Sequence, residues 1–210
     1  MGKVVLIIVV SLFLSKESHA EKPQSTTNFL VWGNIGHAYQ QGAVAFGLGR
    51  EWWLSPVISV ELSARGGAAS YSHKRIPENN LAAQNVSARI NFEMVSLSPR
   101  FNIQVGSETD NYIFAGVPLN ACFLQTKGNM RYETTTRYTA KNNMGPLFSS
   151  GLEIGFAGSL FEGINVRAYL GGPYINFRKS IEKLDFVSQG APENFTAQIR
   201  GTKFGITFCF

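Results

Sequence analysis

The sequence has little charge, few cysteines and no long apolar segment after its start. Charged residues make up 16% of the 210 residues. Beyond the first 20 residues, no run approaches the 18 unbroken apolar residues of a transmembrane helix, which argues against helical membrane spans. Lys and Arg outnumber Asp and Glu by 19 to 14, but no basic run exceeds two residues, so nucleic acid is not an expected partner.

Metal-binding and cofactor-binding patterns are also missing. No His, Cys and Asp residues have ligand spacing, and we expect no metal and no cofactor. The glycines of 47–49 and 171–172 precede no helical pattern, so they indicate strands rather than phosphate loops. The predicted strands place Cys122 and Cys209 roughly 25 Å apart at ~3.3 Å per residue. Because a disulfide needs Cα atoms within about 7 Å, both are expected to be small buried side chains.

The first 20 residues predict a secretory signal peptide. Lys3 supplies a positive charge, residues 4–14 are apolar except for Ser11, and Ser18 and Ala20 fit the positions that a signal peptidase reads. The alternative is a membrane anchor, but eleven helical residues cover about 16 Å, roughly half of a bilayer core. The domain organisation we expect is a signal peptide at 1–20 and one domain at 21–210.

Glycine and aromatic residues are abundant, with 21 Gly, 16 Phe and 7 Tyr. This composition suits many short strands joined by turns. Apolar residues alternate with period two, which predicts strands. A change of phase in the fourth predicted strand suggests a β-bulge near 95–96. The eight predicted strands lie near 28–37, 44–49, 58–65, 86–103, 113–123, 152–156, 164–170 and 204–210.

The predicted connections alternate in length, except that the first outer loop, near 39–41, is short. Short turns fall at 51–55, 106–111 and 157–162, and long polar loops at 72–85, 126–146 and 179–194. An even number of strands with short turns at one end and long loops at the other is typical of outer-membrane barrels. The predicted fold class is therefore all-β, an eight-stranded antiparallel up-and-down transmembrane β-barrel. A soluble β-sandwich or lipocalin-like barrel would also alternate, but its polar face should carry more charge.

The last predicted strand carries apolar residues at 204, 206, 208 and 210 on one face. Such a strand is typical of a barrel whose outer face meets lipid. Phe204, Phe208 and Phe210 are thus expected to face the membrane and to serve as the C-terminal signal for barrel assembly. Trp52 and Trp53, beside a short turn, predict an interfacial aromatic belt; ordinary core packing is the alternative.

The opposite faces of the predicted strands carry charges of both signs. Because eight strands leave a lumen that side chains fill, and buried charges need partners, we expect a paired polar interior rather than an ion path. The predicted lumen network comprises Glu61, Arg65, Arg89, Glu93, Arg100, Glu153, Arg167 and Lys203.

One central pair of segments resembles a known family. Residues 91–94 read Asn-Phe-Glu-Met and residues 112–119 read Tyr-Ile-Phe-Ala-Gly-Val-Pro-Leu. With 151–155 and the phenylalanine end, they are similar to the small porin-like outer-membrane β-barrel domain family, which pairs an aromatic-Leu-Glu-Ile-Pro strand with one containing Ala-Gly-Pro. Val95 stands in place of the family's proline, and Val117 interrupts Gly-Pro. The resemblance implies the barrel fold and the bacterial outer membrane.

We expect a non-enzymatic structural, adhesive or partner-binding protein, with a narrow small-solute channel and a lipid A-modifying enzyme as alternatives. The enzyme needs an imidazole beside a hydroxyl, yet two residues after His37 and His73 stand Tyr39 and Arg75. Expected partners are membrane lipid, lipopolysaccharide, the barrel assembly machinery and an extracellular or periplasmic protein. The loop residues we expect at a contact are Tyr71, Lys74, Arg75, Arg131, Tyr132, Arg137 and Tyr138.

Overall fold

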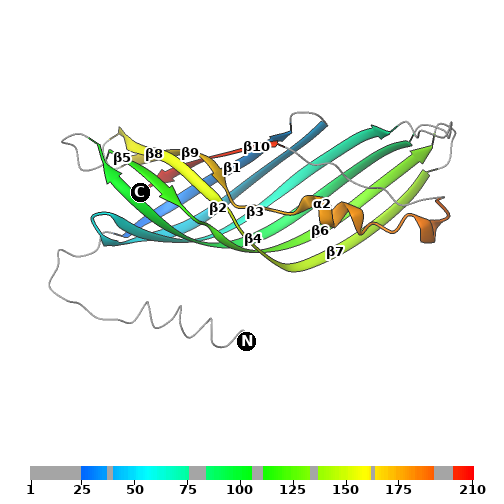
Figure 1. Ribbon diagram of the computed structural model, residues 1–210, viewed down its shortest axis with the longest axis horizontal. Helices are drawn as coiled ribbons and strands as arrows, with labels where there is room; N and C mark the ends of the chain where they lie inside the picture. Colours follow the sequence, from blue (N-terminus) through cyan, green and yellow to red (C-terminus); the bar gives the residue numbers. More distant parts are fainter. Residues whose placement is uncertain are drawn as a thin grey trace.

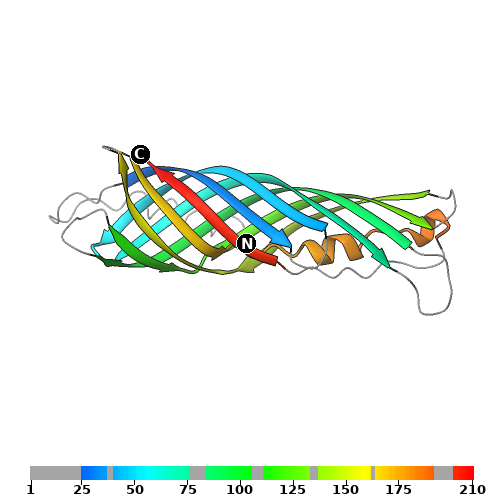
Figure 2. The same ribbon diagram turned by 90° about the horizontal axis from the view of Figure 1, so that it is seen from above.

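Ten antiparallel strands form one curved sheet in the computed structural model (Figures 1 and 2). The structure describes residues 25–36, 40–75, 84–105, 111–132, 137–161, 164–191 and 201–210, so the predicted signal peptide lies outside the described residues. The strands are β1 (Ser25–Gly36), β2 (Gln40–Ser55), β3 (Ile58–Arg75), β4 (Gln84–Gln104), β5 (Tyr112–Gly116), β6 (Leu119–Tyr132), β7 (Arg137–Ser150), β8 (Leu152–Phe161), β9 (Ile164–Gly172) and β10 (Gly201–Cys209). Two short helices follow β9: α2 (Phe177–Glu182) and the 3₁₀ helix η1 (Val187–Gln189).

Eight of these strands close into a ring in the order β3-β2-β1-β10-β9-β8-β5-β4, and β4 pairs back to β3. β5 and β6 are separated only by Val117 and Pro118, and β7 and β8 only by Gly151. Each of these pairs is therefore one long segment that runs the length of the barrel. The predicted eight-stranded antiparallel up-and-down barrel is confirmed.

The sheet extends beyond the ring on one side. β4 is 21 residues long; its residues 100–104 pair with β5, and its residues 84–97 pair with β6. β6 in turn pairs with β7. We call this part the extension: residues 66–75, 84–94, 122–132 and 137–147 of the sheet, together with 173–191. Figures 1 and 2 show β3, β4, β6 and β7 running well past the ends of β1, β9 and β10.

Two sequence predictions about this region are wrong. The expected long loop at 126–146 is mostly the hairpin strands β6 and β7, and the expected loop at 179–194 begins with α2 and η1. The expected bulge near 95–96 is also absent, because β4 pairs with β3 and β6 without interruption there. A register shift instead falls between Cys122 and Leu124 of β6, opposite Met144 and Leu147 of β7.

The change of phase in β4 has another cause, which is a change of surroundings. Its buried face is apolar from Val86 to Met94 and polar from Ser96 to Asn102. Its exposed face is the reverse, polar from Asn85 to Glu93 and largely apolar from Val95 to Ile103. The same face of β4 points inward along the whole strand. Residues 95–103 therefore give the ring a polar interior and an apolar exterior. Residues 85–94 give the extension an apolar interior and a polar exterior.

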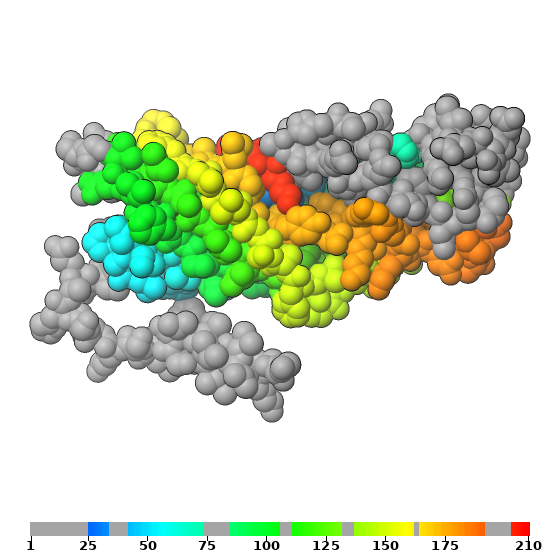
Figure 3. All heavy atoms as spheres, viewed as in Figure 1, coloured from blue at the N-terminus to red at the C-terminus, as the bar shows by residue number. Residues whose placement is uncertain are grey.

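The apolar interior of the extension is covered by the segment that follows β9. Phe177 of α2 lies 5.4 Å from Phe92 of β4, measured between ring centroids, and Leu184 and Phe186 are fully buried over Gly128 of β6. Figure 3 shows this segment (orange) lying along the surface beside β7 (yellow-green). Among the residues that the structure describes, no helix is long and apolar enough to cross a membrane.

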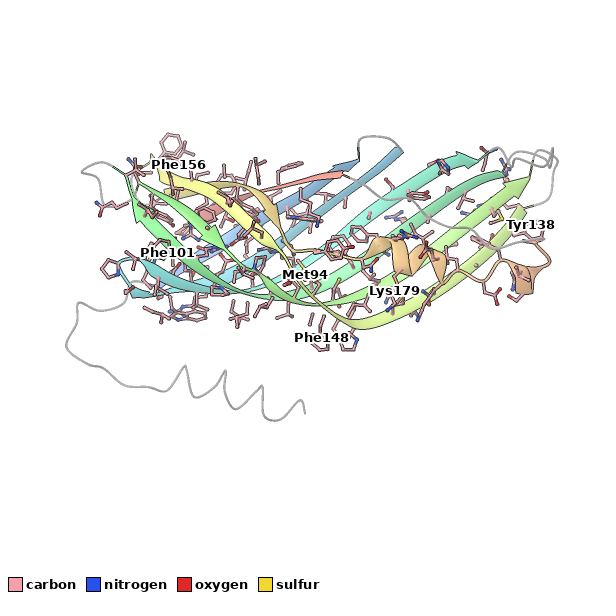
Figure 4. All side chains as sticks on the ribbon, viewed as in Figure 1. Met94, Phe101, Tyr138, Phe148, Phe156 and Lys179 are labelled. Carbon is pink, nitrogen blue, oxygen red and sulfur yellow. The ribbon has the colours of Figure 1, made fainter. Side chains whose placement is uncertain are left out.

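The exposed apolar side chains gather around the ring. Phe101 of β4 is 52% exposed, Phe156 of β8 is 49% exposed, and Phe148 at the end of β7 is 81% exposed. Phe148 and Phe156 project away from the barrel wall (Figure 4). A closed ring that satisfies its backbone internally and turns such side chains outward is suited to lipid. We call this girdle the apolar band.

Candidate functional site

Charged side chains fill the interior of the ring. Arg100 of β4 lies at the centre: its Nη1 is 3.0 Å from Glu61 Oε2 and 3.5 Å from Glu51 Oε1, and its Nε is 2.6 Å from Glu153 Oε1. Arg100 therefore joins carboxylates from β2, β3 and β8. All four residues are at most 3% exposed, so these ion pairs are shielded from solvent and depend on one another.

Two further arginines complete this lumen network. Arg167 of β9 contacts Glu51 of β2, with β1 and β10 between them in the ring, so the pair spans the lumen. Arg167 Nε also donates a 2.6 Å hydrogen bond to the hydroxyl of Tyr112. Arg65 Nη2 lies 3.6 Å from Glu61 Oε1. Three guanidinium groups thus face three carboxylates, which makes the cluster neutral overall.

Neutral polar side chains hold the carboxylates in place. Asn28 Nδ2 donates to Glu61 Oε2 at 2.7 Å, and the Ser59 hydroxyl donates to Glu51 Oε1 at 2.7 Å. Because β1 and β3 supply these donors, the network is fixed from several directions around the ring. The carboxylates of Glu61 and Glu51 thus contact both guanidinium groups and neutral hydrogen-bond donors.

The structure brings together five of the eight residues predicted for the lumen, namely Glu61, Arg65, Arg100, Glu153 and Arg167. Glu51 was missed, because it was assigned to a turn. Ala45, Gly47 and Gly49 share the inward face of β2. If this alternation is extended by two residues, it predicts that Glu51 also faces the lumen.

Three of the predicted lumen residues do not join this network. Arg89 and Glu93 are on the exposed face of β4, so their assignment to the lumen is wrong. The physical reason is the uninterrupted alternation of β4, which keeps the whole odd-numbered face outside. Lys203 is half-buried, and its Nζ lies 4.4 Å from the centroid of the Tyr174 ring rather than beside a carboxylate.

The predicted aromatic belt is only partly on the outer surface. Trp53 packs edge-to-face against the buried Tyr112 at a centroid distance of 5.3 Å, so it faces inward. Trp52, on the opposite face, lies with its ring 6.0 Å from the Arg50 guanidinium carbon. The inward position of Trp53 follows from its place two residues after Glu51 on the same strand face.

The C-terminal phenylalanines are on the outer face of β10. Phe204 and Phe208 are half-buried and Phe210 is 61% exposed. The Phe210 backbone exchanges hydrogen bonds with Thr27, at 2.9 and 3.1 Å, which fixes the end of the chain to β1. Their role as a signal for assembly stays a prediction.

The remaining predicted residues divide as follows. Cys122 and Cys209 are buried free thiols, as predicted. His37 lies outside the described residues, and His73 is half-buried, with its ring 6.5 Å from that of Tyr71. Tyr71 itself faces the buried side of β3, so its place among exposed contact residues is wrong. In the described part of the chain, no group of three His, Cys, Asp or Glu side chains could hold a metal.

Of the other predicted contact residues, Arg131 and Arg137 are exposed and Tyr138 is half-buried. The side chains of Lys74, Arg75 and Tyr132 lie outside the described residues. Arg131 and Arg137 belong to a second charged region, on the exterior of the extension. Arg89 of β4, Lys127 of β6 and Lys141 of β7 form a row there, because each is the register partner of the next.

Beside this row is a surface hollow of about 760 Å³. Its exposed lining combines cations with hydroxyl and amide groups and, among the described residues, includes no carboxylate. These residues are Ser70, Ser72, Ser87, Arg89, Lys127, Asn129 and Arg137. Arg137 donates to the side-chain oxygen of Asn129 from Nε at 3.2 Å and from Nη2 at 2.8 Å, which orients its guanidinium along this surface.

No family model matches the sequence, and no curated protein matches it. Solved structures that are similar at low identity include the following three. Ail of Yersinia pestis, the attachment invasion locus protein, solved with the heparin analogue sucrose octasulfate, is 10% identical with a TM-score of 0.44, over 90% of this chain and 100% of that one. The N-terminal β-barrel domain of Pseudomonas aeruginosa OprF is 13% identical with a TM-score of 0.39, over 90% of this chain and 100% of that one. Acinetobacter baumannii CarO is 13% identical with a TM-score of 0.47, over 88% of this chain and 96% of that one.

The architecture itself defines the class of protein. A closed ring of eight strands, an interior filled with polar side chains and an exterior apolar band make this a small β-barrel of the outer-membrane type. Since Phe210 pairs with Thr27, both ends of the barrel segment lie at the end of the ring opposite the extension.

Proposed function

We propose that the protein is a non-conducting, non-enzymatic outer-membrane barrel that acts by binding at its extracellular end. The observation that carries this proposal is the lumen network, in which Arg100 joins Glu51, Glu61 and Glu153 with almost no exposure to solvent. Eight-stranded barrels have interiors that side chains fill, and here the filling is charged, paired and neutral. The function then resides on the exterior.

The extension supports the same conclusion. Its interior is packed with apolar side chains, including Phe92, Phe177 and Phe186, which are poor surroundings for a hydrated solute. It lies at the opposite end of the barrel from the Phe210–Thr27 pairing. In barrels of this class the end that carries that pairing is the periplasmic end. The extension is therefore the part that meets the outside of the cell.

The partners that this proposal implies follow from the surfaces. Membrane lipid surrounds the apolar band, and lipopolysaccharide surrounds the barrel above it. The barrel assembly machinery reads the last strand, β10, and a protein or glycan from outside contacts the extension. No enzymatic role is proposed because Ser72 and His73 point to opposite faces of β3 and do not combine as nucleophile and base.

The proposal is tested by measuring ion conductance across planar bilayers that contain the purified, refolded protein. We expect no discrete conductance steps from the wild type, under conditions in which a known porin gives them. The variant R100A/E153A removes the Arg100–Glu153 ion pair and the contacts of Arg100 with Glu51 and Glu61, and L97A, changed on the lipid face, is its control. Reproducible unitary steps from the wild type and L97A would show that the small-solute channel is the correct alternative.

A further inference from the structure

Basic side chains oppose each other directly on the exterior of the extension. Arg89 is the register partner of Lys127, and Lys127 is the register partner of Lys141. Side chains opposite each other on one face have Cβ atoms about 4.5–5.5 Å apart, and like charges in that position destabilise a sheet. Arg131 and Arg137 form another such pair higher on β6 and β7. The extension thus carries repeated like-charge register pairs that its own fold does not require.

In the described part of the chain, no carboxylate is paired with this row. Among the described residues, Arg89, Lys127, Arg131 and Lys141 form no ion pair. Glu93, an acid on the same face of β4, is four residues from Arg89, which is about 13 Å along the strand. An anionic ligand would remove this repulsion.

The adjoining hollow supplies the groups that recognise a phosphorylated sugar. Arginine forms paired hydrogen bonds with phosphate oxygens, and lysine adds a compact positive charge. Sugar hydroxyls can form hydrogen bonds with the other polar groups of the hollow, which are the hydroxyls of Ser70, Ser72 and Ser87 and the amide of Asn129.

The position of the row relative to the membrane selects among anionic ligands. Phe46 of β2 and Phe123 of β6 are exposed side chains of the apolar band, and both stand in the register row of Glu93, the first exposed polar residue beyond Val95 on β4. Arg89 is about 13 Å further along β4, which is about 10 Å along the barrel axis at a strand tilt of ~40°. That height lies just beyond the acyl chains, where the polar groups of the outer leaflet are.

We propose that this surface, which we call the basic flank (Arg89, Lys127, Arg131, Arg137 and Lys141 with the serines of the hollow), binds the phosphorylated sugars of lipopolysaccharide in its own membrane. The inference rests on the proposed function, because it gives that exterior surface a ligand. The basic flank is on the side of the barrel, at the height of a neighbouring glycolipid's headgroup. A lipid in the same leaflet therefore reaches it by lateral diffusion and displaces the ions that screen its charge.

The test compares two double variants that remove the same charge. R89Q/K127Q neutralises the basic flank, and K179Q/K183Q neutralises two exposed lysines at α2. Each protein is placed in nanodiscs, and its affinity for purified lipopolysaccharide and for the chemically dephosphorylated form is measured by calorimetry. We expect R89Q/K127Q to weaken lipopolysaccharide binding by about tenfold or more, and dephosphorylation to weaken wild-type binding similarly. K179Q/K183Q should bind as the wild type does.

Heat-modified mobility on gels establishes that every variant has folded. Equal affinity of R89Q/K127Q and the wild type would overturn the proposal, as would equal binding of the phosphorylated and dephosphorylated lipids. Tight binding of a free sulfated oligosaccharide without binding of lipopolysaccharide would overturn it as well, and would assign the basic flank to a soluble glycan. None of these results concerns conductance, so failure here and failure of the proposed function are distinguishable.

Discussion

Arg100 and Glu153 form an ion pair over an intervening strand, with Arg100 Nε 2.6 Å from Glu153 Oε1. The register explains how they meet. Arg100 of β4 pairs with Gly116 of β5, and Gly116 pairs with Glu153 of β8, so the three residues form one row. Because the middle residue has no side chain, the two charged groups close over it.

Replacement of Arg100 tests how far the lumen network stabilises the barrel. R100M leaves Glu61 and Glu153 buried without their shared partner, and we expect the free energy of unfolding to fall by about 3–5 kcal/mol. R89M, on the exposed face of the same strand, should change it by less than about 0.5 kcal/mol. Urea titration in lipid vesicles, followed by tryptophan fluorescence, measures both. The double variant R100M/E153M should recover part of the loss; equal stability of R100M and the wild type would contradict this account.

A second prediction concerns the upper edge of the apolar band. Leu97 and Asn91 share the exposed face of β4, six residues apart, with Leu97 inside the band and Asn91 above it. An arginine that faces lipid near the bilayer midplane destabilises a barrel by about 2–4 kcal/mol, and by about 0–1 near the interface. L97R should therefore be markedly less stable than N91R in the same urea titration. If N91R were as destabilising as L97R, the band would extend higher than the exposed side chains indicate.

The ring was predictable from the sequence because its alternation is strong. Each ring strand has one face against lipid and one against the lumen, so period two is preserved and the eight strands could be counted. The extension was not predictable in the same way. In β7, Arg137, Thr139 and Lys141 face water. Because a membrane strand is expected to have an apolar outer face, this polar outer face made the segment resemble a loop.

The site predictions failed where the surroundings of a strand change. On β4, Phe92 and Met94 are apolar and buried, and Val95 and Leu97 are apolar and exposed. If lipid is assumed outside the whole strand, all four apolar residues must face outward, which requires a bulge between Met94 and Val95. That assumption placed Arg89 and Glu93 in the lumen. The lumen residues below that point kept their faces, so Glu61, Arg65, Arg100, Glu153 and Arg167 were assigned to the correct side.

The close approach at Gly116 gives a prediction with a matched control elsewhere in the barrel. A Cβ atom added at Gly116 would lie 2.7 Å from Glu153 Oε1 and 3.0 Å from Arg100 Cγ, so G116A forces the ion pair apart. Gly66 of β3 has no such atom within 4 Å of an added Cβ. G66A should leave the barrel as stable as the wild type or stabilise it by about 0.5 kcal/mol, because glycine weakens a strand interior.

We expect G116A to lower the free energy of unfolding by about 1–3 kcal/mol, the usual range for a side chain forced into a packed interior. The loss should be smaller in a background that already carries R100M/E153M, because the pair that the new methyl group displaces is then gone. Urea titration of the four proteins gives this coupling directly. If G116A destabilised both backgrounds equally, the cost would come from the β5 backbone, and Gly116 would not serve to let Arg100 reach Glu153.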